Sequence, residues 1–299
     1  MTLTTMQFDI LTYIERYQDK FLDMQTISDK THYSVEDVEA TLKQLVSEGL
    51  LDEKQQVTTK AYTLLEPYKV KKAIFMAAGF GSRMVPLTLS MPKPLIKVNG
   101  KRIIETLLDA VLAAGIEDIS IVRGYQAEAF DMLLSKYPMI KFIENPTYNE
   151  ANNIGSALKF KDLMTNAYVL ESDLVLYNPE LIRKYELHTN YIGKYVNYTN
   201  DWCFDVEDEI IRRVNSAGGE NCYHMYGISY WDEKAAQEMV TDIPSVFEME
   251  GGHQRYFDEV ALTYCKDNFE VYIRPVYEGD IIEIDTFGEL QDIDDSYKI

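Results

Sequence analysis

The residues from Gly79 to Lys93 have the types and spacing of a phosphate-binding loop. Gly79 and Gly81 stand one residue apart at the end of a short apolar run. Glycine lets the backbone turn sharply and bring its N–H groups close to a ligand, which suits a phosphate. Arg83 and Lys93 add positive charge nearby. Two glycines alone are also typical of an ordinary surface turn, but the complete stretch favours binding of a phosphate.

Acidic side chains follow two other apolar runs. The run at 167–170 is followed by Glu171 and Asp173, and a run near the C-terminus is followed by Glu283 and Asp285. Mg²⁺ is usually held by one or two carboxylates together with phosphate oxygens and water. Strand-end carboxylates also occur without a metal, so their spacing alone leaves a cation site as one of two interpretations.

The string from Ala77 to Leu95 resembles the signature loop of the nucleotidyltransferases, A-A-G-x-G-S/T-R-M/L-x-P-x-T-x-x-x-P-K-P/A-L/M. It lacks the G-x-x-x-x-G-K-S/T of a P-loop, and Met84 stands where a dinucleotide-binding fingerprint has its third glycine. Members of this family condense a nucleoside triphosphate with a phosphorylated small molecule and release pyrophosphate. The resemblance implies catalytic roles for Arg83 and Lys93. It also implies a set of nucleotide-binding residues, namely Ala77, Ala78, Gly79, Gly81, Ser82, Gly124, Tyr125, Asn153 and Ser156.

The resemblance also bears on the metal. In the family the first acidic segment is usually D-x-D, and its second acid holds the metal together with a late aspartate. Asp173 and Asp285 match these positions and are the expected ligands of Mg²⁺. Glu171 replaces the first aspartate of the pattern, which leaves its role open.

Apolar periodicity predicts an α/β domain around these residues. Short apolar runs bounded by polar residues alternate with segments of helical spacing. Strands are expected at 73–78, 119–122, 140–143 and 167–173, and helices at 103–115, around 130–134 and through 158–160. This alternation predicts a mostly parallel, Rossmann-like sheet with helices on both faces, the GT-A-like sheet of the nucleotidyltransferases. Ligands bind such sheets beyond the carboxyl ends of the strands, where the glycine loop lies.

Residues 1–67 are predicted to form a separate domain, with the transferase domain at 71–299. Helical periodicity predicts three helices, the third opened by Ser34 and closed by Gly49, and the segment from Leu50 to Leu65 is expected to form a two-stranded wing. The arrangement resembles a winged helix-turn-helix domain. Residues 1–68 carry six Lys and Arg against twelve Asp and Glu, a net charge of −6, so DNA is not the expected partner. A docking, regulatory or homo-oligomerising role is expected instead.

Composition narrows the class of protein. A net charge of −20 over 299 residues disfavours non-specific binding to nucleic acid or anionic membranes, and it favours a cationic or zwitterionic substrate over a purely anionic one. Cys203, Cys222 and Cys265 lack C-x-x-C spacing, so neither a disulfide framework nor a zinc site is indicated. No apolar run reaches the length of a membrane span and no signal peptide is recognisable, so a cytoplasmic location without a membrane partner is expected.

The second half of the chain is rich in aromatic residues and resembles the bacterial phosphocholine cytidylyltransferases. The segments that carry this resemblance are T-N-D-W at 199–202, G-I-S-Y-W-D at 227–232 and Y-F-D-E at 256–259. A quaternary ammonium group is held against aromatic faces, with carboxylates adding attraction. The implied acceptor site comprises Trp202, Asp258 and Glu283, together with Trp231 and Phe257, which could instead be core residues. The expected substrates are thus CTP and a phosphorylated amino alcohol, phosphocholine, whose phosphate attacks the α-phosphorus in line.

The same sequence features leave other functions open. 2-Aminoethylphosphonate and phosphoethanolamine carry a primary ammonium group, which needs hydrogen-bond acceptors rather than aromatic faces. Sugar 1-phosphates come next, although the chain lacks the E-K-P segment that is expected in sugar-activating relatives. From a different class, the chain could be a transcriptional regulator that senses a nucleotide or a choline metabolite. Arg83, Lys93, Asp173 and Asp285 together favour catalysis over sensing.

Overall fold

The computed structural model describes residues 3–298, which form two compact units. The first unit comprises Met1–Lys69 and Lys184–Leu187, and the second comprises Val70–Arg183 and His188–Ile299. The chain therefore leaves the second unit once, to add four residues to the first. One of these four, Tyr185, is buried in the hydrophobic core of the first unit.

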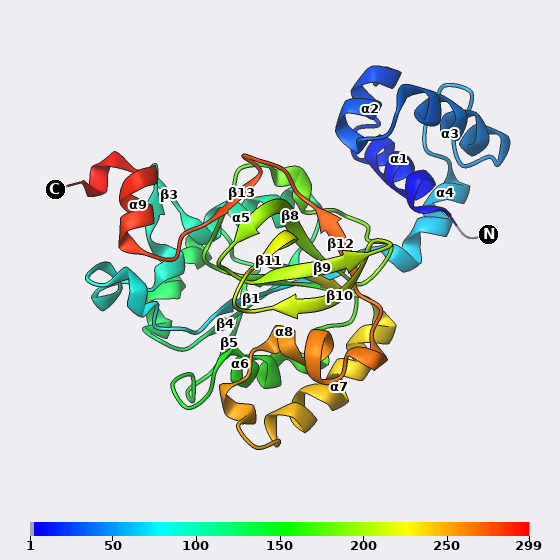
Figure 1. Cartoon of the computed structure of the whole chain (residues 1–299). Coiled ribbons are helices and arrows are strands. Elements are labelled where there is room, and N and C mark those ends of the chain that lie inside the picture. The colour runs from blue at the N-terminus through cyan, green and yellow to red at the C-terminus, as the bar shows by residue number, and fades with distance from the viewer. Residues whose placement is uncertain (1–2, 299) are drawn as a thin grey trace. The chain divides into compact units, whose positions relative to one another are not determined.

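The first unit is built from helices α1 (Thr5–Arg16), α2 (Met24–Thr31), α3 (Val35–Ser47) and α4 (Thr59–Leu65) (Figure 1). Each begins after a side-chain oxygen that accepts a backbone N–H of the first turn, and these capping residues are Thr4, Asp23, Ser34 and Thr58. The apolar faces of the helices meet in one core that includes Phe8, Leu11, Ile27, Leu42, Leu45 and Leu65.

The expected two-stranded wing is only partly present, and its second strand is wrong. Leu51 and Val57 pair in a single antiparallel bridge around a turn. The segment that follows is helix α4, because Thr58 caps it and because Ala61 and Leu65, one turn apart, are both buried. The spacing of Ala61 and Leu65 is typical of a helix rather than of the strand that was predicted for this segment.

A nine-stranded sheet forms the centre of the second unit. Its order is β5 (Lys141–Glu144), β4 (Asp118–Arg123), β1 (Lys72–Ala77), β6 (Ala167–Glu171), β11 (Gly219–Trp231), β8 (Asn190–Thr199), β12 (Tyr272–Pro275), β10 (Ile210–Asn215) and β9 (Cys203–Glu207). The first four strands are parallel to one another, and β11 runs antiparallel to both of its neighbours β6 and β8. The parallel half is the part that was predicted from the strand and helix alternation.

Helices cover both faces of this sheet, as predicted. Alternate residues of β1 show why: Ala73 and Phe75 pack in the same core as helix α5 (Ile103–Ala113), whereas Ile74 packs in the core that includes α6 (Asn153–Phe160) and α7 (Glu233–Phe247). Helices α6, α7 and the short α8 (Phe257–Glu259) lie on the same side of the sheet (Figure 1). The apolar run at 73–78 is thus buried on both faces.

Two small sheets complete the unit. Strand β13 (Ile281–Glu283) pairs antiparallel with β7 (Leu174–Leu176), and β2 (Lys97–Val98) pairs with β3 (Lys101–Arg102). Helix α9 (Phe287–Ile293) follows β13. Within residues 3–298, no helix combines the length and the apolar character needed to cross a bilayer.

Candidate active site

The glycine loop leaves β1 at the carboxyl end of the sheet. Gly81 has φ of +67°, a left-handed conformation that other residues rarely adopt, and a Cβ atom there would lie 3.1 Å from Cβ of Lys93. Thr88 Oγ1 donates a hydrogen bond to the carbonyl oxygen of Gly81 over 3.0 Å. Glycine is therefore required at position 81 both by backbone conformation and by the close approach of Lys93.

Tyr125 donates two hydrogen bonds to this loop. Its backbone N–H donates to the carbonyl of Ala78 over 3.0 Å, and its hydroxyl donates to the carbonyl of Thr88 over 2.8 Å. At the neighbouring Gly124 a Cβ atom would lie 2.7 Å from Cβ of Tyr148, so glycine is required there by packing. Gly124 and Tyr125, predicted to bind the nucleotide, are not among the residues that line the adjoining cavity.

A cavity of about 320 Å³ opens over the glycine loop. Its lining includes most of the predicted nucleotide-binding, catalytic and metal-binding residues, namely Ala77, Ala78, Gly79, Gly81, Arg83, Lys93, Asn153, Ser156, Asp173 and Asp285. Tyr148 and Asn152 also line it and were not predicted, although both belong to the polar segment that contains Asn153. Ser82 lies on a second cavity instead. This first cavity is of the size that a small-molecule ligand occupies, and we call it the nucleotide cavity.

Lys93 is the centre of an ion-pair network in the nucleotide cavity. Its Nζ lies 2.9 Å from Oδ2 of Asp173 and 3.0 Å from Oδ1 of Asp285. The other carboxylate oxygen of Asp285 lies 2.8 Å from Nη1 of Arg83, whose side chain is exposed. Burial acts to lower the pKa of Lys93, but attraction to the two aspartates outweighs it, and the pKa is raised. The side chain of Lys93 is therefore a protonated, positively charged ammonium group at neutral pH.

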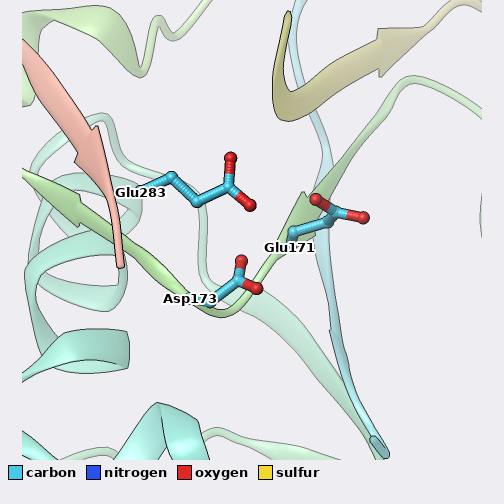
Figure 2. Close-up of side chains that lie close together, drawn as sticks. All are labelled: Glu171, Asp173 and Glu283. Atoms are coloured by element: carbon cyan, nitrogen blue, oxygen red, sulfur yellow. The ribbon is translucent and has the colours of Figure 1, made fainter. Parts of the chain in front are cut away.

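Three carboxylates converge beside this network. Carboxylate oxygens of Glu171, Asp173 and Glu283 all lie within 4.8 Å of one another. Figure 2 shows Glu171 and Asp173 near the end of one strand, with Glu283 reaching in from β13. The pairing of the strands brings these carboxylates together. Glu171 lies opposite Met76 near the end of β1, and Glu283 lies opposite Leu174 of β7, the residue that follows Asp173.

The chemistry of this cluster suits a divalent cation. Burial, followed by repulsion from neighbouring carboxylates, raises the pKa of both Glu171 and Glu283 well above the usual value. Within the described part of the chain, the buried Oδ1 of Asp173 has no hydrogen-bond partner. A hard cation with oxygen ligands would relieve the repulsion and satisfy that atom. Asp285, the other predicted metal ligand, is paired with Lys93 and Arg83, and Asp173 is paired with the same lysine.

A second cavity of about 420 Å³ borders the same carboxylates, and we call it the acceptor cavity after the substrate that was predicted to bind there. Trp202, Asp258 and Glu283, which were predicted to bind the acceptor, line it, and so do Tyr256 and Asp201, which were not selected from the sequence. The ring of Trp202 meets that of Tyr256 edge to face, with centroids 5.0 Å apart. The residues common to both cavities are Arg83, Glu171, Asp173 and Asp285. The two cavities therefore adjoin at the charged cluster.

Asp258 is held by a buried tyrosine. The Tyr191 hydroxyl donates to Oδ1 of Asp258 over 2.8 Å. Burial raises the pKa of Asp258 to about 6, although the hydrogen bond from Tyr191 acts to lower it. The carboxylate is therefore ionised above about pH 6 and can attract a cationic group in the acceptor cavity.

Trp231 and Phe257, also predicted for the acceptor site, belong to the core. Neither ring is exposed, and their centroids lie 5.5 Å apart in the hydrophobic cluster beneath α6 and α7. The indole N–H of Trp231 donates to Oγ of Ser229 over 2.9 Å. Neither residue lines the acceptor cavity. Their aromatic character reflects packing, which is the usual role of a large buried ring.

One glycine of the acceptor cavity has a steric role that the sequence did not indicate. A Cβ atom at Gly227 would overlap Oε2 of Glu171. Strand β11 can therefore lie against the Glu171 carboxylate only where it carries no side chain. Gly227 belongs to the G-I-S-Y-W-D segment noted above, which was the available signal.

The chain matches a family model for nucleotidyl transferases over residues 72–199. The chain is also similar to relatives over most of its length. A 2-aminoethylphosphonate cytidylyltransferase of Lancefieldella rimae is 36% identical over 229 residues, which cover 75% of this chain and 92% of the relative. A choline-phosphate cytidylyltransferase of Streptococcus pneumoniae is 30% identical over 234 residues, which cover 76% and 98%.

The fold is similar to a solved structure as well. A structure of CTP:phosphocholine cytidylyltransferase from Streptococcus pneumoniae superposes with a TM-score of 0.70 and 29% sequence identity. The match covers 77% of this chain and all of that structure's chain. The relatives named here thus share one type of reaction and differ in the acceptor named for each.

Proposed function

This chain belongs to the nucleotidyl transferase family, and we propose that it is a cytidylyltransferase that condenses CTP with phosphocholine to give CDP-choline and pyrophosphate. The observation that carries the acceptor is the aromatic pair of Trp202 and Tyr256 beside the Asp258 carboxylate, in a cavity that adjoins the nucleotide cavity. An aromatic face and a nearby carboxylate are what a quaternary ammonium group requires.

The proposed reaction is a direct phosphoryl-group substitution. An oxygen of the acceptor phosphate forms a bond to the α-phosphorus of CTP, the bond from that phosphorus to the bridging oxygen breaks, and pyrophosphate leaves. A phosphate oxygen is already nucleophilic at neutral pH, so no protein nucleophile is needed. The chain contributes by positioning the substrates and stabilising charge. Lys93 and Arg83, which line the nucleotide cavity, would neutralise charge that develops on the leaving pyrophosphate.

We further propose that a divalent cation, Mg²⁺, is held by Asp173 together with Glu171 and Glu283. The support is the convergence of their three carboxylates and the unpartnered oxygen of Asp173 among the described residues. When bound, the cation would neutralise negative charge on the phosphate oxygens. The Asp285 carboxylate would then serve to orient Lys93 and Arg83.

A pyrophosphate-release screen tests the proposal. The full-length protein with Mg²⁺ is given each of four nucleoside triphosphates with phosphocholine, phosphoethanolamine, 2-aminoethylphosphonate and sugar 1-phosphates. CTP with phosphocholine should give a kcat/KM about tenfold or more above the other pairs, a preference of about 1.4 kcal/mol. Turnover of sugar phosphates alone would contradict the proposal.

2-Aminoethylphosphonate is the second candidate acceptor. The acceptor cavity is lined by carboxylates of Glu171, Asp201, Asp258 and Glu283, and a primary ammonium group has three N–H donors to give them. One of the relatives described above carries this activity in its name. A higher kcat/KM for 2-aminoethylphosphonate than for phosphocholine in the same screen would favour this candidate.

For the first unit we propose a compact variant of the winged helix-turn-helix that mediates docking or self-association rather than DNA binding. Helix α3, where such domains read DNA, exposes Glu36, Asp37 and Glu39 at its start. Light scattering of the full-length protein should report a dimer or larger species, and a gel-shift assay with mixed-sequence duplex DNA should show no complex at physiological salt. A retarded DNA band would overturn this assignment.

A further inference from the structure

The segment that supplies Tyr256 and Asp258 to the acceptor cavity is fastened to residues of the nucleotide cavity. Oδ1 of Asn153 accepts a hydrogen bond from the backbone N–H of Phe257 over 2.6 Å. The N–H of Asn152 donates to the carbonyl oxygen of His253 over 2.7 Å. Asn152 and Asn153 both line the nucleotide cavity. These hydrogen bonds join residues about a hundred positions apart, so a direct structural link connects the two cavities.

The amide oxygen and the amide nitrogen of Asn153 face different groups. A backbone N–H can only donate, so the amide oxygen must be the atom that faces Phe257. The amide nitrogen therefore points away from Phe257, and among residues 3–298 it makes no hydrogen bond. A ligand in the nucleotide cavity can contact Asn153 without displacing Phe257.

The bond to Phe257 also holds Asp258. Phe257 is the first residue of α8, where backbone N–H groups have no partner within the helix. From the other side, the hydroxyl of Tyr191 holds the Asp258 carboxylate. Of these two side chains, Asn153 lines the nucleotide cavity and Tyr191 does not. Asn153 is thus placed to transmit occupancy of one cavity to the other.

We propose that Asn153 is a positioning residue that couples the two substrate sites, so that a nucleotide in its cavity orders the 256–258 segment and tightens binding of the acceptor. The inference rests on the proposed function for the identity of the two substrates. Coupling of this kind is reciprocal, so the acceptor must tighten binding of the nucleotide by the same factor. The role differs from simple nucleotide binding, because loss of Asn153 should weaken binding of the acceptor as well.

Steady-state kinetics on three variants of the full-length protein separate the roles. Asn153→Ala removes the acceptor of the Phe257 hydrogen bond, and Asn153→Asp retains an oxygen there while it loses the amide donor. With CTP saturating, Asn153→Ala should raise the KM for phosphocholine by roughly 3- to 10-fold, the range expected for one hydrogen bond. Asn153→Asp should restore that KM to within about twofold of the wild type, since the hydrogen bond is rebuilt.

The matched control is Asn268→Ala. Asn268 donates to Oδ2 of Asp242 over 2.9 Å and lines neither cavity, so its loss should leave both KM values unchanged. If Asn153→Ala instead raised the KM for CTP and left that for phosphocholine unchanged, Asn153 would be a nucleotide-binding residue only, and the coupling would be wrong.

Amide hydrogen exchange tests the link without any acceptor. CTP with Mg²⁺ should slow exchange in the peptide around Phe257 in the wild type but not in Asn153→Ala, and it should slow exchange less in Asn153→Asp, which keeps the hydrogen bond to Phe257 and loses the amide donor available to the nucleotide. Absence of this protection in a wild-type protein that binds CTP would overturn the inference. Failure of every acceptor in the turnover screen would count against the proposed function, whereas the exchange result would still decide the coupling.

Discussion

The hydroxyl group of Tyr191 lies 2.8 Å from Oδ1 of Asp258, and both residues are buried. Tyr191 comes from β8 and Asp258 from the short helix α8, 67 positions later. The ring of Tyr191 is held in turn by Phe204 and Trp231. The core of the unit therefore sets the position of a carboxylate that lines the acceptor cavity.

Removal of this hydroxyl should weaken the acceptor site selectively. Tyr191→Phe should raise the KM for the acceptor by roughly 3- to 10-fold, because one hydrogen bond to a buried carboxylate is lost. The KM for CTP should stay within about twofold of the wild type, since Tyr191 does not line the nucleotide cavity. Pyrophosphate-release kinetics measure both values, and equal changes in the two would contradict the assignment.

Binding of a cationic acceptor should weaken in acid. Burial raises the pKa of Asp258 to about 6, so its carboxylate is charged above that pH and neutral below it. As the pH falls through about 6, the attraction for an ammonium group is lost and the KM for the acceptor should rise. Asp258→Asn serves as the control, because titration of the acceptor's own phosphate is common to both proteins. The dependence should be flatter in the variant, and identical profiles would rule out Asp258 as the titrating group.

Loss of Asp173 should abolish turnover without unfolding the protein. Asp173→Asn removes a charge from the carboxylate cluster and from the ion pair with Lys93, and the rate of pyrophosphate release should fall by roughly a hundredfold or more. Asp285→Asn should have a similar effect through Lys93 and Arg83.

Thermal denaturation gives a second measurement at this cluster. Mg²⁺ should raise the Tm of the wild type and not that of Asp173→Asn, since binding to the folded state alone stabilises it. Asp131→Asn, which alters an exposed partner of Arg123, is the control and should keep both activity and the Tm response. Near-normal pyrophosphate release by Asp173→Asn would exclude the metal assignment.

A methyl group at position 227 should disturb Glu171. Because a Cβ atom there would overlap the Glu171 carboxylate, Gly227→Ala should destabilise the fold by about 1–3 kcal/mol, as overpacking does. The double variant Glu171→Ala/Gly227→Ala should be more stable than Gly227→Ala alone, since the clashing group is gone. Urea denaturation measures both, and equal stabilities would place the strain elsewhere in β11.

The two tryptophans should respond differently to substitution. Trp202→Ala should raise the KM for a quaternary ammonium acceptor by roughly 3- to 30-fold, the loss expected for a cation–π contact of about 0.5–2 kcal/mol. Trp231→Phe should instead lower the Tm and change that KM much less than Trp202→Ala does, because Trp231 is fully buried in the core and does not line the acceptor cavity. A change in the KM for CTP as large as that for the acceptor would remove Trp202 from the acceptor site.

Local sequence signals determined the catalytic half of the chain. The apolar run at 73–78, the two glycines after it and the alternation of strands with helices are encoded over short distances, and they predicted the parallel half of the sheet. Because parallel strands bring their carboxyl ends to one edge, the meeting of the glycine loop with Glu171 and Asp173 followed from the same pattern.

Contacts between residues far apart in the chain decided how the other acids and the aromatic residues are placed at the site. Strand β13 pairs with β7 outside the main sheet, and this pairing brings Glu283 to Asp173 while Asp285 turns to Lys93. Nothing within a local window distinguishes the two acids. In the same way, Tyr256 and Trp231 are both aromatic residues followed by an aspartate within two positions, and only the tertiary packing exposes one to the acceptor cavity and buries the other. The sequence by itself determined the type of reaction, whereas the shape of the acceptor site depends on contacts between residues far apart in the chain.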